Sequence, residues 1–200
     1  MRSKNLAIVF AALVVIAGAV AAGARAEGEL TAPAIGSTID DFTLPDVDNK
    51  DRSLKSLAGK NGTVLLFIAV QCPVSNAYNE RMAKLAEDYK AKGIAVVGIN
   101  SNVAEDAAAV KAHAAEHKLS FPILKDPGNK IADRFGASVT PEAYFIDANN
   151  KLLYHGRIDN SRNAAQVESN DLRNALDAAL AGKAIEKTEA KAFGCTIKRA

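Results

Sequence analysis

Two cysteines are the residues of this chain with the most distinctive chemistry, and they stand far apart in the sequence. Cys72 follows an unbroken apolar stretch at 63–69 and precedes a proline and a helix-like pattern. Cys195 lies near the end of the chain, in AFGCTIKRA. A thiol reacts as its thiolate, and a cysteine with an ordinary pKa is only about 3% ionised at pH 7. A reactive role for Cys72 therefore needs a positive electrostatic environment.

Two sources could supply this environment. A helix that begins near Pro73 would point its positive end at Cys72, and this contributes roughly 0.3–2 kcal/mol, enough for partial ionisation. A nearby cation would complete it. Arg157 in HGRID is the first candidate for this cation, and Arg81 is the second. A solvated surface position explains each arginine equally well, so sequence alone leaves both interpretations open.

The elements that would position these residues alternate between strands and helices. Apolar runs predict strands, helical spacing of apolar residues predicts helices, and the turn at 148–150 predicts a hairpin. The expected strands are 63–69, 94–100, 121–124, 142–147 and 152–159, and the expected helices are one from about 74 that ends at Gly93, then 103–118, 129–135 and 170–180. This order predicts an α/β fold with a mixed central β-sheet flanked by helices.

Several stretches resemble the thioredoxin-fold redoxins, in the peroxiredoxin-like branch of the alkyl hydroperoxide reductase and thiol-specific antioxidant proteins. DFTLPDVDNKD at 41–51 resembles their opening hairpin, and the segment at 121–147 resembles their later half with its Thr-Pro. LLYHGRID at 152–159 and FGCTIKR at 193–199 resemble a peroxiredoxin-like subgroup. The resemblance covers nearly all of 33–199 and implies a thioredoxin-like fold with an N-terminal β-hairpin extension.

This resemblance places Cys72 at the reactive corner of the fold, in the position of the peroxide-attacking thiol. Peroxiredoxins have a threonine three residues earlier, where this chain has Ala69, so a hydroxyl that would orient the peroxide is missing. Ala69 also rules out a disulfide within the motif that ends at Cys72, which disfavours an ordinary dithiol reductase. By the same resemblance, Pro141 is the cis-proline beside the cysteine, and the backbone of Thr140 pairs with an incoming peptide or thiol.

The sequence allows three interpretations of the role of Cys195. In the first, the protein is a thiol-dependent oxidoreductase: a hydroperoxide converts Cys72 to a sulfenic acid, and Cys195 resolves it as a disulfide that an external thiol reductant reopens. In the second, the same disulfide is a structural link in a non-catalytic binding or scaffold module, since closing a loop of roughly 100 residues stabilises a fold by about 4.7 kcal/mol. A third is thiol–disulfide exchange with protein substrates.

The first 26 residues have the pattern of an export signal. Basic residues precede an uncharged run from Leu6 to Ala24, and the small-x-small sequence at 24–26 predicts cleavage after Ala26. Residues 27–200 then form one thioredoxin-like domain. We expect a periplasmic or secreted protein, attached to a membrane only if the signal is not cleaved. In such a compartment both cysteines can stay oxidised.

Charge and motifs exclude several function classes. Without residues 1–26, the chain has 22 basic and 23 acidic residues and no basic block, which argues against nucleic acid and anionic membranes as partners. No heme, nucleotide or metal motif is evident, so we expect no cofactor. The chemistry, if the protein is an enzyme, therefore belongs to sulfur.

Three further patterns have simpler explanations. The H-x-x-E-H spacing from His113 to His117 occurs in one class of zinc protease, but no third ligand with its own motif follows, and the composition suits a solvated helix. DVDNKD, from Asp46, begins like a calcium loop but lacks its glycine and its glutamate, so we interpret it as a hairpin turn. His155 is interpreted as a half-buried strand histidine and not as a general base.

Overall fold

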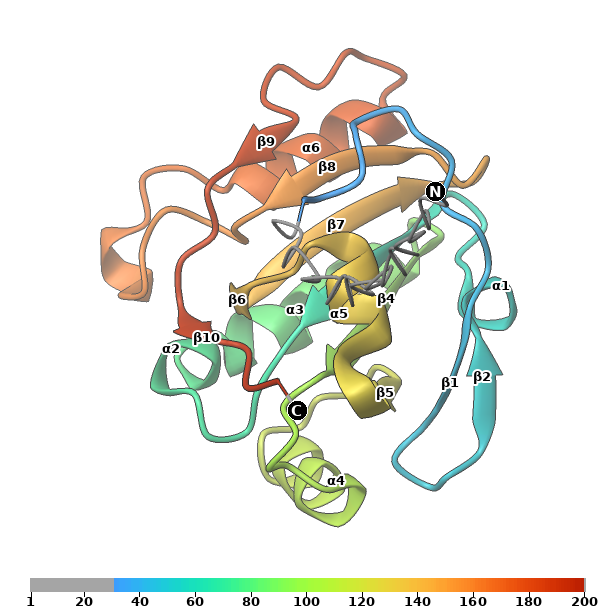
Figure 1. Ribbon diagram of the computed structural model, residues 1–200. Coiled ribbons are helices and arrows are strands. Elements are labelled where there is room, and N and C mark those ends of the chain that lie inside the picture. The colour runs from blue at the N-terminus through green and yellow to red at the C-terminus, as the bar shows by residue number, and fades with distance from the viewer. Residues whose placement is uncertain (1–30, 200) are drawn as a thin grey trace, which may run out of the picture.

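The computed structural model describes residues 31–199, and its centre is a six-stranded mixed β-sheet (Figure 1). The strand order is β5-β4-β3-β7-β8-β9, with β3, β4 and β5 parallel and β7 antiparallel to β3 and β8. The strands are β3 (Gly62–Phe67), β4 (Ile94–Asn100), β5 (Ile123–Lys125), β7 (Glu142–Asp147), β8 (Leu152–Gly156) and β9 (Glu189–Ala190). The proposed export signal lies outside the described residues.

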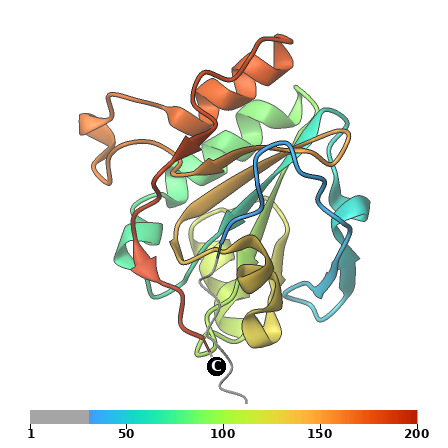
Figure 2. The same cartoon turned by 45° about the horizontal axis from the view of Figure 1, so that its top comes forward.

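Helices cover both faces of this sheet, so the predicted α/β, thioredoxin-like architecture is confirmed. Figures 1 and 2 show α5 on one face and α3 and α6 on the other. No helix of the described residues is long and apolar enough to cross a bilayer. The helices are α1 (Leu54–Leu57), α2 (Pro73–Asn76), α3 (Asn79–Lys90), α4 (Ala107–Glu116), α5 (Lys130–Phe135) and α6 (Asp171–Leu180), with 3-10 turns η1 (Pro127–Asn129) and η2 (Ala164–Gln166).

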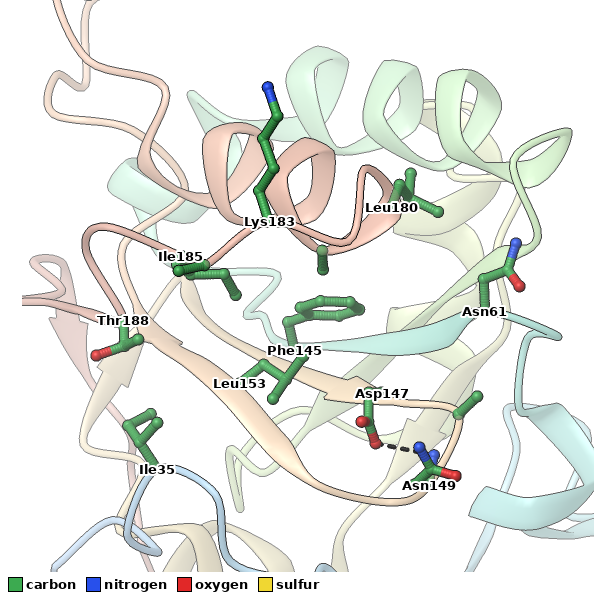
Figure 3. A pocket seen from close by; sticks show the side chains of 13 residues that line it. Ile35, Asn61, Phe145, Asp147, Asn149, Leu153, Leu180, Lys183, Ile185 and Thr188 are labelled. Carbon is green, nitrogen blue, oxygen red and sulfur yellow. Dashed lines mark hydrogen bonds between the residues drawn. The ribbon is translucent and has the colours of Figure 1, made fainter.

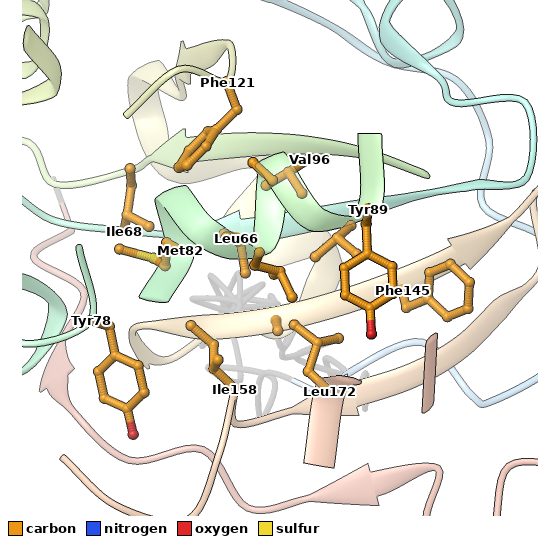
Figure 4. Close-up of a cluster of buried hydrophobic side chains, with 14 of the residues drawn as sticks. Leu66, Ile68, Tyr78, Met82, Tyr89, Val96, Phe121, Phe145, Ile158 and Leu172 are labelled. Carbon is orange, nitrogen blue, oxygen red and sulfur yellow. The ribbon is translucent and has the colours of Figure 1, made fainter. Parts of the chain in front are cut away.

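The central strand β3 has an apolar sequence because both of its faces are buried. Side chains alternate across a strand, and here each face is covered. Val64 and Leu66 belong to the core cluster under α3 and α6, part of which is drawn in Figure 4. Leu65 and Phe67 belong to the second cluster, which includes side chains of α5. All four are 0% exposed, so both faces of β3 are buried along these four positions.

The predicted N-terminal hairpin forms from β1 (Thr43–Pro45) and β2 (Asp51–Ser53), which pair antiparallel. Asp46 closes the turn between them: its Oδ1 accepts a hydrogen bond from the backbone N–H of Lys50 at 3.0 Å, and its Oδ2 accepts one from Nε of Arg52 at 2.9 Å. These bonds help lower the pKa of Asp46 below its usual value. The interpretation of this segment as a hairpin turn is confirmed.

The helix expected from about residue 74 to Gly93 is wrong in one respect, because the structure breaks it into α2 and α3 at Tyr78. Tyr78 is 1% exposed, and its hydroxyl donates to Oδ1 of Asp159 at 2.9 Å. A partner 81 positions away gives no signal in local helical periodicity. The helix expected at 103–118 is also shorter, because the Asp106 side chain accepts from the backbone N–H of Ala109 at 2.7 Å and begins α4 there.

A matched pair of valines tests the two-sided burial of β3. Val64→Ala removes methyl groups from a position that is 0% exposed, and we expect it to lower the free energy of unfolding by about 2 kcal/mol. Val103→Ala makes the same change at a side chain that is 61% exposed, and we expect a change below about 0.5 kcal/mol. Urea denaturation measures both. Equal losses in the two variants would contradict this account of the core.

Candidate active site

Two short strands bring the cysteines together. β6 (Val139–Thr140) pairs antiparallel with β10 (Cys195–Thr196), and in this register Cys195 lies opposite Thr140. The thiol of Cys72 donates a hydrogen bond to the carbonyl oxygen of Thr140 at 3.2 Å. The side chain of Cys195 lies beside this sulfur and lowers the pKa of Cys72. Both cysteines are free thiols, and both lie at Thr140.

The approach of the tail to β6 depends on a glycine. A Cβ atom on Gly194 would lie 1.9 Å from the carbonyl oxygen of Thr140, a distance no side chain can tolerate. The peptide bond between Thr140 and Pro141 is cis, as predicted. The edge of β6 that the resemblance assigns to an incoming peptide is therefore occupied by the chain's own β10.

The tail on either side of β10 is also anchored. The ring of Phe193 packs edge to face on that of Tyr78, with centroids 6.3 Å apart. Ile197 is 3% exposed and belongs to the second core cluster. Nε of Arg199 donates to Oδ1 of Asp133 at 2.9 Å. Contacts on both sides therefore fix the position of the second cysteine.

Cys72 begins α2 and is almost completely enclosed. Its sulfur accepts a hydrogen bond from the backbone N–H of Ser75 at 3.2 Å, and Pro73 occupies the first helical turn. The residue is only 3% exposed. Ser75 stands three residues after Cys72, so the start of α2 has the spacing C-x-x-S. Whether the motif is counted backwards to Ala69 or forwards to Ser75, it contains a single thiol.

Hydrogen-bond donors explain why Cys72 is the more acidic of the two thiols. Burial raises its pKa, but donation by the thiol of Cys195, by the Thr140 side chain and by the backbone N–H groups of Ser75 and Cys195 outweighs burial, so the pKa lies below the ordinary thiol value. Burial and the neighbouring Cys72 thiol raise the pKa of Cys195. Cys72 is thus suited to be the thiolate and Cys195 the proton donor.

The two arginines considered as activating cations have other partners. Nε of Arg157 donates to Oδ2 of the buried Asp171 at 2.7 Å. Nη1 of Arg81 donates to Oδ2 of Asp159 at 2.6 Å. The other expected source of positive potential at Cys72 was the dipole of the helix that follows it. This dipole is weaker than expected, because α2 has only four residues. The role of Arg157 at Cys72 stays a prediction, and the described donors to the sulfur are uncharged.

Glu105, a buried carboxylate beside the reactive corner, was not predicted from the sequence. Its Oε2 accepts from the backbone N–H of Val70 and its Oε1 from that of Gln71, both at 2.9 Å. Burial raises its pKa, but these bonds and two from asparagine side chains lower it below the usual value, so the group stays ionised. Glu105 therefore fixes the two residues before Cys72. Its position shortly after an apolar strand was the available signal.

Glu142 was missed as well, and it gives His155 a partner. Glu142 accepts hydrogen bonds from the backbone N–H groups of Ser138 at 2.9 Å and Val139 at 3.2 Å, which hold the turn into β6. Its Oε1 lies 2.6 Å from Nε2 of His155, whose ring stacks on Tyr144 with centroids 4.4 Å apart. His155 is partly buried, as expected, and it supports this carboxylate.

The two histidines of the zinc-like pattern lie next to each other. The rings of His113 and His117 lie 4.3 Å apart, and Nε2 of His113 is 3.2 Å from Nδ2 of Asn79. Among residues 31–199, no three His, Cys, Asp or Glu side chains are grouped to hold a metal ion.

A pocket of about 530 Å³ lies away from the cysteines, and Figure 3 shows the side chains that line it. Phe145 and Leu153 line it, together with Asp147, which pairs with Gly62 at the start of β3. Cys72 follows the other end of β3. The pocket therefore takes no part in the thiol chemistry described above.

Comparison with known proteins agrees with this geometry. Residues 35–155 match the model of the AhpC/TSA family. Thiol-disulfide oxidoreductase ResA of Geobacillus thermodenitrificans (strain NG80-2) is 31% identical over 124 residues, which cover 62% of this chain and 70% of that protein. Chloroplastic peroxiredoxin Q of Triticum aestivum is 32% identical over 126 residues, covering 60% of this chain and 57% of that protein.

Among solved structures, a hypothetical protein from Sinorhizobium meliloti 1021 is similar over most of the chain. It has 35% sequence identity and a TM-score of 0.79, and the match covers 85% of this chain and 97% of that one. The names of the two sequence relatives both denote redox enzymes, and the family match covers more than half of the sequence. This thioredoxin-fold chain therefore belongs to the AhpC/TSA family of thiol-dependent redox proteins.

Proposed function

We propose that this protein is an exported thiol peroxidase in which Cys72 is the nucleophile and Cys195 is the resolving cysteine. The observation that carries the proposal is that both cysteines meet at Thr140: the thiol of Cys72 donates to its carbonyl oxygen, and Cys195 lies opposite it in the β6–β10 ladder. In keeping with this geometry, the pKa of Cys72 is lowered and that of Cys195 is raised. A nucleophile held beside its resolving partner needs no large rearrangement before the disulfide forms.

The first step consumes the peroxide. The Cys72 thiolate attacks one peroxide oxygen, the O–O bond breaks, and the second oxygen leaves and takes up a proton, as an alcohol or as water. Cys72 is then a sulfenic acid. The backbone N–H of Ser75, which donates to the sulfur of Cys72, is one of the groups that stabilise the attacking thiolate.

The second step forms the disulfide. The sulfur of Cys195 loses its proton and attacks the sulfenic sulfur of Cys72, the S–O bond breaks, and water leaves. Two thiols and one peroxide thus give one disulfide, one alcohol and one water. An external thiol reductant returns the enzyme to its dithiol form, and the partly exposed Cys195 is the sulfur that such a reductant reaches.

Burial of Cys72 favours a small oxidant over a protein substrate. With the residue 3% exposed and the edge of β6 paired with β10, a peroxide fits the approach to the sulfur better than a peptide does. Ala69 is the opposing feature, because it provides no hydroxyl to orient the peroxide. We therefore expect a slower peroxidase than one with threonine at this position.

A second candidate function is thiol–disulfide exchange with protein substrates through the same two cysteines. The similarity to thiol-disulfide oxidoreductase ResA favours it. The two functions differ in the oxidant, since exchange needs a partner disulfide and a peroxidase needs none. A structural disulfide in a non-catalytic module is the remaining alternative, and it predicts that the reduced protein gains no reactivity toward peroxide.

Export would place this thiol chemistry in an oxidising compartment. The charge and apolar pattern of residues 1–26 supports secretion to the periplasm or beyond. In such a compartment a disulfide persists until a dedicated reductant reopens it.

Peroxide titration tests the proposal. We expect one equivalent of hydrogen peroxide to oxidise both thiols of each reduced protein molecule, so that two fewer thiols can be labelled afterwards. The mass of the unlabelled protein should fall by two hydrogens. Intact mass spectrometry after thiol alkylation measures both. Cys195→Ser blocks resolution, so the sulfenic acid on Cys72 should persist and react with dimedone. Unchanged labelling at one equivalent of peroxide, with oxidation by a protein disulfide instead, would favour the exchange function.

A conservative pair at position 195 tests the source of the acidity of Cys72. Cys195→Ala removes a hydrogen-bond donor to the thiolate, so the pKa of Cys72 should rise. Cys195→Ser keeps a donor, so the pKa should stay closer to that of the wild type. The pH dependence of alkylation of Cys72 gives the midpoint for each variant. Identical midpoints would show that Cys195 does not stabilise the thiolate.

A further inference from the structure

The loop between β4 and α4 lies beside both segments that carry the cysteines (Figure 1). Glu105 in this loop accepts hydrogen bonds from the two backbone N–H groups that precede Cys72. Oδ1 of Asn102 in the same loop accepts the backbone N–H of Lys198 at 2.8 Å, three residues beyond Cys195. One short loop therefore holds the chain just before one thiol and just after the other.

These two contacts are joined within the loop. Nδ2 of Asn102 donates to Oε1 of Glu105 at 3.0 Å. Nζ of Lys125 donates to the backbone carbonyl oxygens of Glu105 at 2.5 Å and of Asn102 at 3.3 Å. Asn102 is 9% exposed and Glu105 is 3% exposed. Hydrogen bonds to a charged group strengthen when water is excluded, so the loop is a stiff connection between its two contacts.

The loop binds the C-terminal segment through both the backbone N–H and the backbone carbonyl of Lys198. Besides the bond from its N–H to Asn102, Lys198 accepts through its carbonyl oxygen the backbone N–H of Val103 at 3.0 Å. The Val103 side chain is 61% exposed. Hydrogen bonding, with little apolar burial, therefore holds this part of the tail to the loop.

We propose that Asn102 and Glu105 are positioning residues that hold Cys195 against Cys72 for disulfide formation. The proposal rests on the two-thiol cycle described above. Holding two reacting groups in contact raises their effective concentration. The side chains of both residues bind backbone groups and each other, so they act on the sulfurs through the chain. β6 holds the tail from its other side, so loss of the loop contact weakens the disulfide without abolishing it.

Equilibration with glutathione tests this role. We expect Asn102→Ala to lower the equilibrium constant for forming the Cys72–Cys195 disulfide about five- to tenfold, the effect of one net hydrogen bond. Thiol labelling and intact mass across a series of reduced to oxidised glutathione ratios give the constant. Asn160→Ala is the matched control, because Oδ1 of Asn160 accepts the backbone N–H groups of Glu168 and Ser169 in another loop. This control should leave the constant unchanged.

The outcomes separate the positioning role from the proposed function. If the wild type forms the disulfide and Asn102→Ala has the same constant, the positioning role is wrong. Glu105→Gln should shift the constant in the same direction as Asn102→Ala, and if this buried variant fails to fold, Asn102→Ala decides alone. A wild-type protein that forms no Cys72–Cys195 disulfide with either peroxide or oxidised glutathione overturns the proposed function, and the positioning role with it.

Discussion

The site depends on the backbone pairing of β10 with β6. This ladder has only two residue pairs, yet it sets Cys195 opposite Thr140 and so brings together two sulfurs that the sequence separates widely. Gly194 makes the approach possible, because a side chain there would collide with the Thr140 carbonyl. The anchored residues before and after β10 supply the burial and hydrogen bonding that a two-residue ladder lacks on its own.

The same pairing determines the electrostatics of Cys72. A buried thiolate is unfavourable unless donors surround it, and here the donors are a second thiol, a hydroxyl and backbone amides. Uncharged donors stabilise the anion over short distances. This arrangement links acidity to the position of the tail, because Cys195 is both a donor to the thiolate and the group that would resolve its oxidised form.

Burial and acidity together limit what can react. The nucleophilic sulfur is enclosed, whereas Cys195 at the chain end is partly exposed. A small oxidant would react at the sulfur of Cys72, and a larger thiol reductant would approach the sulfur of Cys195. Membership of the AhpC/TSA family, with relatives named as a thiol-disulfide oxidoreductase and as a peroxiredoxin, agrees with a thiol site that can be adapted to either oxidant.

The sequence by itself determined the elements whose signals are local. The predicted strands at 94–100 and 142–147 match β4 and β7 in full, because their apolar runs reflect burial of each residue where it stands. It also singled out the corner cysteine and the family. Only the tertiary structure decided that β10 pairs with β6, that Arg157 binds Asp171, and that Glu105 holds the loop before the cysteine. Each of these depends on a partner brought close by folding, and the pattern of neighbouring residues does not identify that partner.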